Sequence, residues 1–68
     1  MREFAKRLKE LREYKELSLF ELSKQIGIGA SSLCRWENGQ SDIKSDHLID
    51  LAKFFNVTVG YLVGTEDL

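Results

Sequence analysis

Hydrophobic residues recur at helical spacing in the first part of the chain. Phe4, Leu8 and Leu11 stand at positions i, i+4 and i+7, which places their side chains on one face of an α-helix. Charged residues occupy most of the positions between them. The pattern predicts an amphipathic helix over residues 2–15.

A second helix is indicated by its own start and stop signals. Ser18 is a residue type that caps helix N-termini, and Glu21, three residues later, completes a capping box. Leu22 then faces inward. Gly27 ends the helix, because glycine readily takes the left-handed backbone conformation that a helix end often needs. We therefore predict a helix over residues 19–25.

The third helix is predicted over residues 30–37. Leu33 and Trp36 are three positions apart, so both face the core from one side of this helix. The dipeptide Asn38-Gly39 is a strong turn signal and ends it. The opposite side of the helix carries mostly short side chains.

The last two helices also carry recognisable ends. Ser45 or Asp46 is expected to cap the fourth helix, and Asn56 to take the left-handed position at its C-terminus. Its hydrophobic positions keep helical spacing: Leu48, Leu51, Ala52 and Phe55. Thr58 caps a short fifth helix that Gly64 ends. No segment alternates with period two, so we predict an all-α fold of five helices.

Size and composition limit the possible classes of protein. The chain has 68 residues, of which 43% are hydrophobic, enough for one small domain over residues 1–68. There is no long apolar run for a membrane span, and residues 1–17 are charged where a signal peptide would be apolar. One cysteine and one histidine form neither an internal disulfide nor a metal cage. We expect a cytoplasmic protein without metal or cofactor.

The charges are divided unevenly along the chain. Ten Lys and Arg against eleven Asp and Glu give a net charge of −1. Residues 1–40 hold eight cations and six anions, a balance of +2, whereas residues 41–68 hold two cations and five anions, a balance of −3. The net charge argues weakly against a polyanionic partner, and the polarity along the chain is mild.

An enzyme is not expected, because the chain lacks a suitable set of catalytic groups. Ser31, Cys34 and His47 could act as nucleophile and base, but they do not share one predicted helix, and no carboxylate is placed to orient them. Cys34 could alternatively act as a redox sensor, but we expect it to be only a small residue that adapts to its surroundings. His47 is expected on the surface. A basic stripe on the first helix is expected to be mainly a solvated face: Lys6, Arg7 and Lys9.

Helices two and three, joined by a short turn, form a helix-turn-helix candidate. Ser23 is small where the two helices must approach closely, and Ile28 can fill the corner. Four segments, "RLKELRE", "LSLFELSKQIGI", "SLCRWENG" and "LIDLAKFFNVTVGYLVG", resemble the Cro/CI-type (lambda-repressor-like, XRE) helix-turn-helix family over nearly the whole chain. The resemblance implies a compact five-helix DNA-binding domain that regulates transcription, with repression as the expected mode.

The same resemblance implies how the third helix is used. In that fold it lies in the major groove of double-stranded DNA. The small side chains of Ala30, Ser31 and Ser32 let its backbone approach the bases, and Arg35, one turn beyond Ser31, is the one long side chain on that face. Arginine bound bidentately to guanine is the commonest specific base contact. We expect base contacts from these four residues, although the serines could instead serve the first turn of their own helix.

Further roles carry over from the family. Arg12 and Glu37 match a partly buried ion pair that joins the first helix to the end of the third. The N-termini of helices two and four would direct backbone N–H groups at phosphates. Contacts with the DNA backbone are expected at the following positions: Leu19, Lys24, Asn38, Gly39, Gln40 and Lys44.

The chain also departs from the family pattern. Leu19 stands where the family commonly has a glutamine that contacts phosphate, and Gly29 replaces the usual Ser or Thr cap. Asp42 and Asp46 are acidic where basic or neutral residues are frequent. We therefore predict few phosphate contacts and weak non-specific binding.

The expected assembly is a homodimer on a pseudo-palindromic operator, with the two recognition helices about one DNA turn apart. We expect dimer contacts from the loop after the third helix and from the region that runs from Asn56 through the fifth helix. Formation of the dimer only on DNA is an alternative left open.

A second class of function stays open, namely a protein-binding module such as an antitoxin or an anti-repressor. The net charge of −1 and the missing glutamine favour it, whereas the small-residue face with Arg35 favours DNA. Leu19 and Phe20 would hold the partner. Phe54 and Tyr61 are further residues that the five-helix pattern does not clearly bury.

Overall fold

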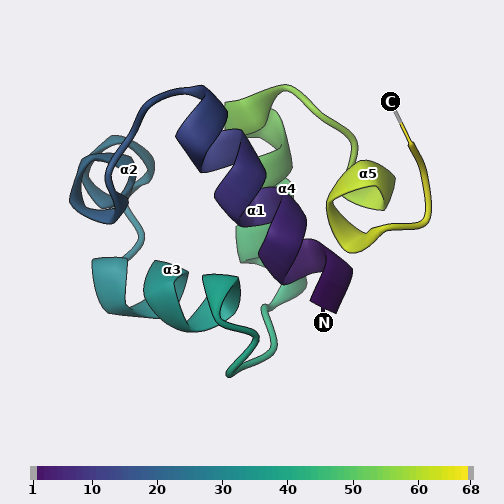
Figure 1. Ribbon diagram of the computed structural model, residues 1–68, viewed down its shortest axis with the longest axis horizontal. Coiled ribbons are helices and arrows are strands. Elements are labelled where there is room, and N and C mark those ends of the chain that lie inside the picture. The colour runs from purple at the N-terminus through teal and green to yellow at the C-terminus, as the bar shows by residue number, and fades with distance from the viewer. Residues whose placement is uncertain (1, 68) are drawn as a thin grey trace.

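The structure is a computed structural model, and it describes residues 2–67. These residues form an all-α fold without strands, as predicted. Figure 1 shows α1 crossing in front of α4, with α3 below them and α5 to one side. The helices run as follows: α1 Arg2–Tyr14, α2 Leu19–Ile26, α3 Ala30–Glu37, α4 Ser45–Phe55 and α5 Val59–Val63.

The start of α2 is fixed by the predicted capping box. The Ser18 hydroxyl accepts a hydrogen bond from the Glu21 backbone N–H at 3.0 Å, and the Glu21 carboxylate accepts one from the Ser18 N–H at 2.8 Å. The hydrogen bond from the Ser18 backbone N–H is the main reason that the pKa of Glu21 lies below 4.5, and the Ser18 side chain lowers this pKa further. The capping carboxylate therefore stabilises the fold above pH 4.5, and this stabilisation is lost as the pH falls through the lowered pKa.

Helix α4 does not begin with the expected cap. Its N-cap is Lys44, which has extended backbone angles and no capping side chain, and whose carbonyl accepts the N–H of Leu48 at 3.0 Å. Ser45 and Asp46 therefore lie inside the first turn, so the prediction that one of them caps α4 was wrong. A first-turn carboxylate still favours this helix through the helix dipole.

The other helix ends follow the sequence signals. Gly27, Asn56 and Gly64 all take the left-handed conformation, with φ of 77°, 56° and 88°. The hydroxyl of Thr58 accepts the N–H of Tyr61 at 2.9 Å and caps α5.

The core gathers residues from all five helices and from the corner between α2 and α3. Helix α1 packs against α3 and α5, α2 against α3 and α4, and α4 against α5. The buried hydrophobic residues are Phe4, Ala5, Leu8, Leu22, Ile28, Leu33, Trp36, Leu51, Ala52, Phe55 and Leu62.

Several aromatic side chains lie at the margin of this core. Phe54 packs edge-on against Phe55, with ring centroids 5.0 Å apart. His47, expected on the surface, is half-buried because its ring lies against Trp36, with centroids 5.5 Å apart. Phe20 remains 66% exposed.

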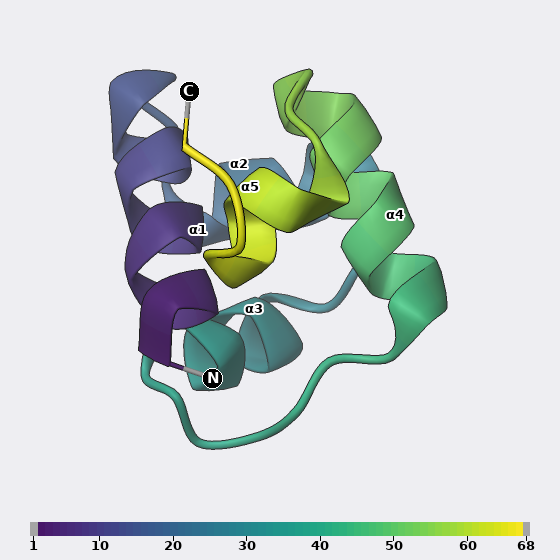
Figure 2. The same ribbon diagram turned by 90° about the vertical axis from the view of Figure 1, so that its right-hand side faces the viewer.

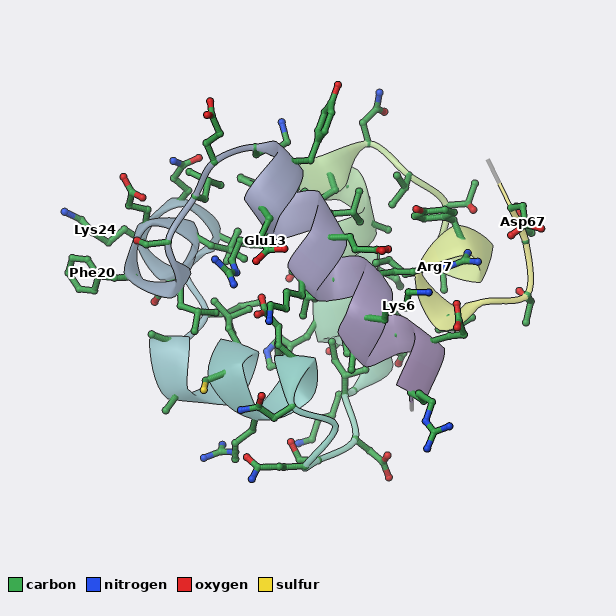
Figure 3. The ribbon with its side chains drawn as sticks, viewed as in Figure 1. Lys6, Arg7, Glu13, Phe20, Lys24 and Asp67 are labelled. Carbon is green, nitrogen blue, oxygen red and sulfur yellow. The ribbon has the colours of Figure 1, made fainter. Side chains whose placement is uncertain are left out.

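Arg7 is not part of a solvated basic stripe, which corrects the expectation for that residue. Its guanidinium donates to the carbonyls of Tyr61 and Glu66 at 2.7 and 2.6 Å, and to the carboxylates of Asp67 and Glu3 at 3.0 and 3.1 Å. The guanidinium carbon also lies 4.4 Å from the centroid of the Tyr61 ring. The side chain is only 14% exposed, and it holds the C-terminal segment against α1 and α5 (Figure 3).

We predict that Ser18→Ala lowers the free energy of unfolding by about 1 kcal/mol, because it removes the hydroxyl that caps α2. Urea unfolding of both proteins measures the difference. Ser45→Ala is the matched control. That serine has no capping bond, so we expect a change within about 0.5 kcal/mol. A larger loss for Ser45→Ala would contradict the assigned start of α4.

Candidate nucleic-acid interface

The exposed side of α3 presents one continuous stripe. Ser31, Arg35 and Asn38 are spaced at i, i+4 and i+7, and all three are exposed. Leu33 and Trp36 on the opposite side are buried in the core and fix the rotation of the helix. The structure therefore turns two short polar side chains and one long cation toward solvent.

The Arg35 guanidinium is available to a ligand. It donates a 3.5 Å hydrogen bond to the hydroxyl of Ser32, three residues earlier on the same helix. Within residues 2–67, no carboxylate lies at ion-pair distance from it. Ala30 and Ser32 are half-buried, so they lie beside the stripe rather than at its centre.

The corner between α2 and α3 sets the position of the exposed stripe. The left-handed Gly27 ends α2 and donates to the carbonyl of Ser23 at 2.9 Å. Ile28 is buried directly after it, as predicted for a residue that fills the corner. Gly29 then caps α3 without a side-chain hydrogen bond.

A bidentate ion pair joins α1 to the C-terminal end of α3. The Arg12 guanidinium binds both carboxylate oxygens of Glu37, at 2.7 and 3.0 Å, and donates to the carbonyl of Leu17 at 2.7 Å. The two charged side chains are 13% and 6% exposed. The hydrogen bond that Arg12 donates to the Glu37 carboxylate raises the pKa of Arg12 above its ordinary value. The pair neutralises the one acidic residue in α3.

The residues expected at the DNA backbone fall into three places. Leu19 is half-buried, because its side chain packs against the core. Lys24 is exposed, with its ammonium 5.4 Å from the centroid of the Phe20 ring, and both point outward from α2 (Figure 3). The remaining four are exposed along the loop from α3 to α4: Asn38, Gly39, Gln40 and Lys44.

The two helix N-termini expected to face phosphates differ from one another. At α2, Ser18 and the Glu21 carboxylate already occupy backbone N–H groups. At α4 no side chain caps the helix, although Asp46 stands in its first turn. Both ends therefore carry a carboxylate where an anion would bind.

One polar pocket next to α3 was not predicted from the sequence. It lies between the first half of α1 and the end of α3, and its lining residues are Arg2, Ala5, Lys6, Glu37, Asn38 and Gly39. The i, i+4 spacing of Arg2 and Lys6 is visible in the sequence. That this side of α1 faces the end of α3 depends on tertiary packing.

Other kinds of site find little support in the part of the chain that the structure describes. Within residues 2–67, no three His, Cys, Asp or Glu side chains gather as a metal site. None of the described helices is long and apolar enough to cross a membrane. Cys34 is half-buried, and its sulfur lies 3.5 Å from the side-chain amide of Asn38.

Comparison with known proteins gives HTH-type transcriptional regulators and one antitoxin as relatives. The activator BcrR of Enterococcus faecalis, an HTH-type transcriptional activator, is 32% identical over 66 residues, which cover 97% of this chain and 32% of that protein. The HTH-type transcriptional regulator YobD of Bacillus subtilis is 33% identical over 64 residues, covering 94% and 57%. The antitoxin PezA of Streptococcus pneumoniae is 32% identical over 63 residues, covering 93% and 40%.

The chain thus spans between 32% and 57% of the length of these relatives. A family model described as a helix-turn-helix domain matches residues 5–68. Together with the α2–α3 geometry, this match confirms the resemblance seen in the sequence. The chain belongs to the helix-turn-helix domain family, of the XRE or Cro/CI-like type.

Proposed function

We propose that the chain is a sequence-specific reader of double-stranded DNA that represses transcription, with α3 in the major groove. The observation that carries this proposal is the exposed stripe of α3, where short side chains flank a single free guanidinium. Because Ser31 and Asn38, the other members of this stripe, are short, the backbone of α3 can approach the base edges. Arg35 would then bind guanine bidentately.

The dimensions of α3 suit the groove. Its eight residues span about 12 Å at 1.5 Å per residue, and the major groove is about 12 Å wide. Ala30, Ser31 and Ser32 lie in the N-terminal half of α3, and in helix-turn-helix proteins this half of the recognition helix contacts the base edges. Their small size supports the role of base contacts beside Arg35.

The charge distribution supports modest binding to the DNA backbone. Lys24, Lys44 and the polar loop residues 38–40 are the proposed phosphate contacts, and Glu21 and Asp46 oppose them. We expect the affinity to fall less steeply with salt than for a protein that makes about 6–10 phosphate contacts. A homodimer on a pseudo-palindromic operator would make each specific base contact twice, although the charge of each protomer stays the same.

Repression is proposed because a small domain bound across a promoter excludes other proteins from it. No catalytic step is part of the proposal. The relatives are bacterial proteins, and a bacterial protein that binds chromosomal DNA would act in the cytoplasm. The antitoxin among the relatives and the exposed ring of Phe20 support a second candidate, a module that binds a protein partner.

Selection from a random duplex DNA library tests the main proposal. We expect enrichment of a two-fold symmetric site, with half-sites about one DNA turn apart. Titration of the enriched site at two salt concentrations then separates specific from non-specific binding. Failure to enrich any site would contradict the proposal.

We predict that Phe20→Glu weakens binding to the selected site by only about threefold, because one added charge on the outer side of α2 costs on the order of 1 kcal/mol or less. A reporter gene under the selected operator should stay repressed. The neutral variant Phe20→Gln controls for the loss of the ring. Full DNA binding combined with loss of regulation in both variants would instead support a protein partner at this surface.

A further inference from the structure

We propose that Arg2 and Lys6 form a second anion site, for a phosphodiester group of the same DNA duplex that α3 reads. The site lies beside the C-terminal end of α3. Arg2 and Lys6 were not among the residues expected at the interface, whereas Asn38 and Gly39, which also line the pocket, were. This inference rests on the proposed function and extends the contact surface from the helix-turn-helix to α1.

The placement of α1 brings these cations to the recognition helix. The N-terminal end of α1 lies beside the end of α3 and the loop that follows it (Figures 1 and 2). The pocket is lined from α1 by Arg2, Ala5 and Lys6, and from the end of α3 and the residues after it by Glu37, Asn38 and Gly39. A ligand there would touch both elements.

The pocket carries a net positive charge. Arg2 and Lys6 are both exposed, and within residues 2–67 neither lies at ion-pair distance from a carboxylate. Glu37 is the one acidic residue in the lining, and Arg12 binds both of its oxygens. Arg7 on the same helix is held by the C-terminal segment instead. Lys9 also lacks an ion pair among residues 2–67, but it does not line the pocket.

The pocket also lies in line with the stripe that faces the bases. Asn38 ends that stripe, seven residues after Ser31, and lines the pocket as well. Because α3 is about as long as the major groove is wide, residues just past its end reach the wall of the groove. That wall consists of phosphate groups, which are the anions that an unpaired Arg and Lys bind.

The double variant Arg2→Ala/Lys6→Ala tests the site. Each neutralised phosphate contributes about 0.9 to the slope of log affinity against log salt. Because the site holds one phosphodiester group, we expect the slope to become shallower by about 0.9 per protomer. Between 50 and 200 mM salt, wild type should lose about 3.5-fold more affinity per protomer than the variant. The base preference in a library selection should stay unchanged, because α3 is untouched.

Lys15→Ala/Lys53→Ala is the matched control, since it removes the same charge away from the pocket. Lys15 follows α1, with its ammonium 5.8 Å from the Phe54 ring near the end of α4, and Lys53 lies in the last turn of that helix. We expect the salt slope of this control to equal that of wild type. Equal slopes for the two double variants would overturn the site while leaving the α3 proposal standing. A wild-type protein that selects no duplex would overturn both.

Discussion

Arg35→Ala should abolish the preference for one base pair in each half-site of the selected operator. A bidentate arginine contributes about 1–3 kcal/mol of discrimination, and a dimer makes the contact twice. We therefore expect the affinity for the selected site to fall between about 30-fold and 10⁴-fold. Because Arg35 lies on the exposed stripe, and its side chain bonds within residues 2–67 only to the Ser32 hydroxyl, the free energy of unfolding should change by less than about 0.5 kcal/mol.

Arg35→Lys separates charge from geometry at this position. Lysine keeps the positive charge but lacks the planar fork that matches the guanine edge. We expect this variant to retain the salt dependence of wild type and to lose the base preference. Competitive titration against duplexes changed at single positions gives the measurement. Unchanged discrimination in Arg35→Ala would show that another part of α3 reads the site.

The largest effect on stability is expected for Glu37→Leu. The substitution leaves the Arg12 guanidinium, which is 13% exposed, without its carboxylate, and breaking a buried ion pair costs about 3 kcal/mol or more. A 68-residue domain has roughly 3–10 kcal/mol of stability in all. We expect a Tm lower by at least about 12 °C, measured by thermal unfolding.

A double-mutant cycle assigns this loss to the pair. Arg12→Met should also be strongly destabilising, since it strands the Glu37 carboxylate and the carbonyl of Leu17. The double variant Arg12→Met/Glu37→Leu should lose only about 1 kcal/mol, the value of one hydrogen bond. Additive losses in the double variant would contradict a coupled pair. Glu10→Gln, at an exposed position of α1, should stay within about 0.5 kcal/mol of wild type.

Most helix boundaries were predictable because their signals are local. The capping box at Ser18 and the left-handed positions at Gly27 and Asn56 each depend on a few adjacent residues. The start of α4 was not, since Ser45 and Asp46 are both good caps by type, whereas the backbone turns into the helix one residue earlier, at Lys44. Cap preference ranks residue types, but it does not determine at which residue the backbone changes from loop to helix.

The candidate site divides in the same way. Burial of Leu33 and Trp36 at helical spacing determines which side of α3 faces outward, so the stripe around Arg35 could be predicted. The pocket at Arg2 and Lys6 could not, because it depends on how α1 crosses the end of α3. Periodicity shows which face of a helix is polar, but not which neighbour that face meets.

The contacts of Arg7 carry a consequence for folding during protein synthesis. Its partners Tyr61, Glu66 and Asp67 lie 54, 59 and 60 positions later in the chain. At roughly 5–20 residues per second, they follow Arg7 out of the ribosome by about 3–12 seconds. Until then α1 lacks both the hydrogen bonds of Arg7 to the C-terminal segment and the surface of α5 against which it packs. We therefore expect the domain to finish folding only after residue 67 has emerged from the ribosome. Before that, its hydrophobic core is accessible to chaperones.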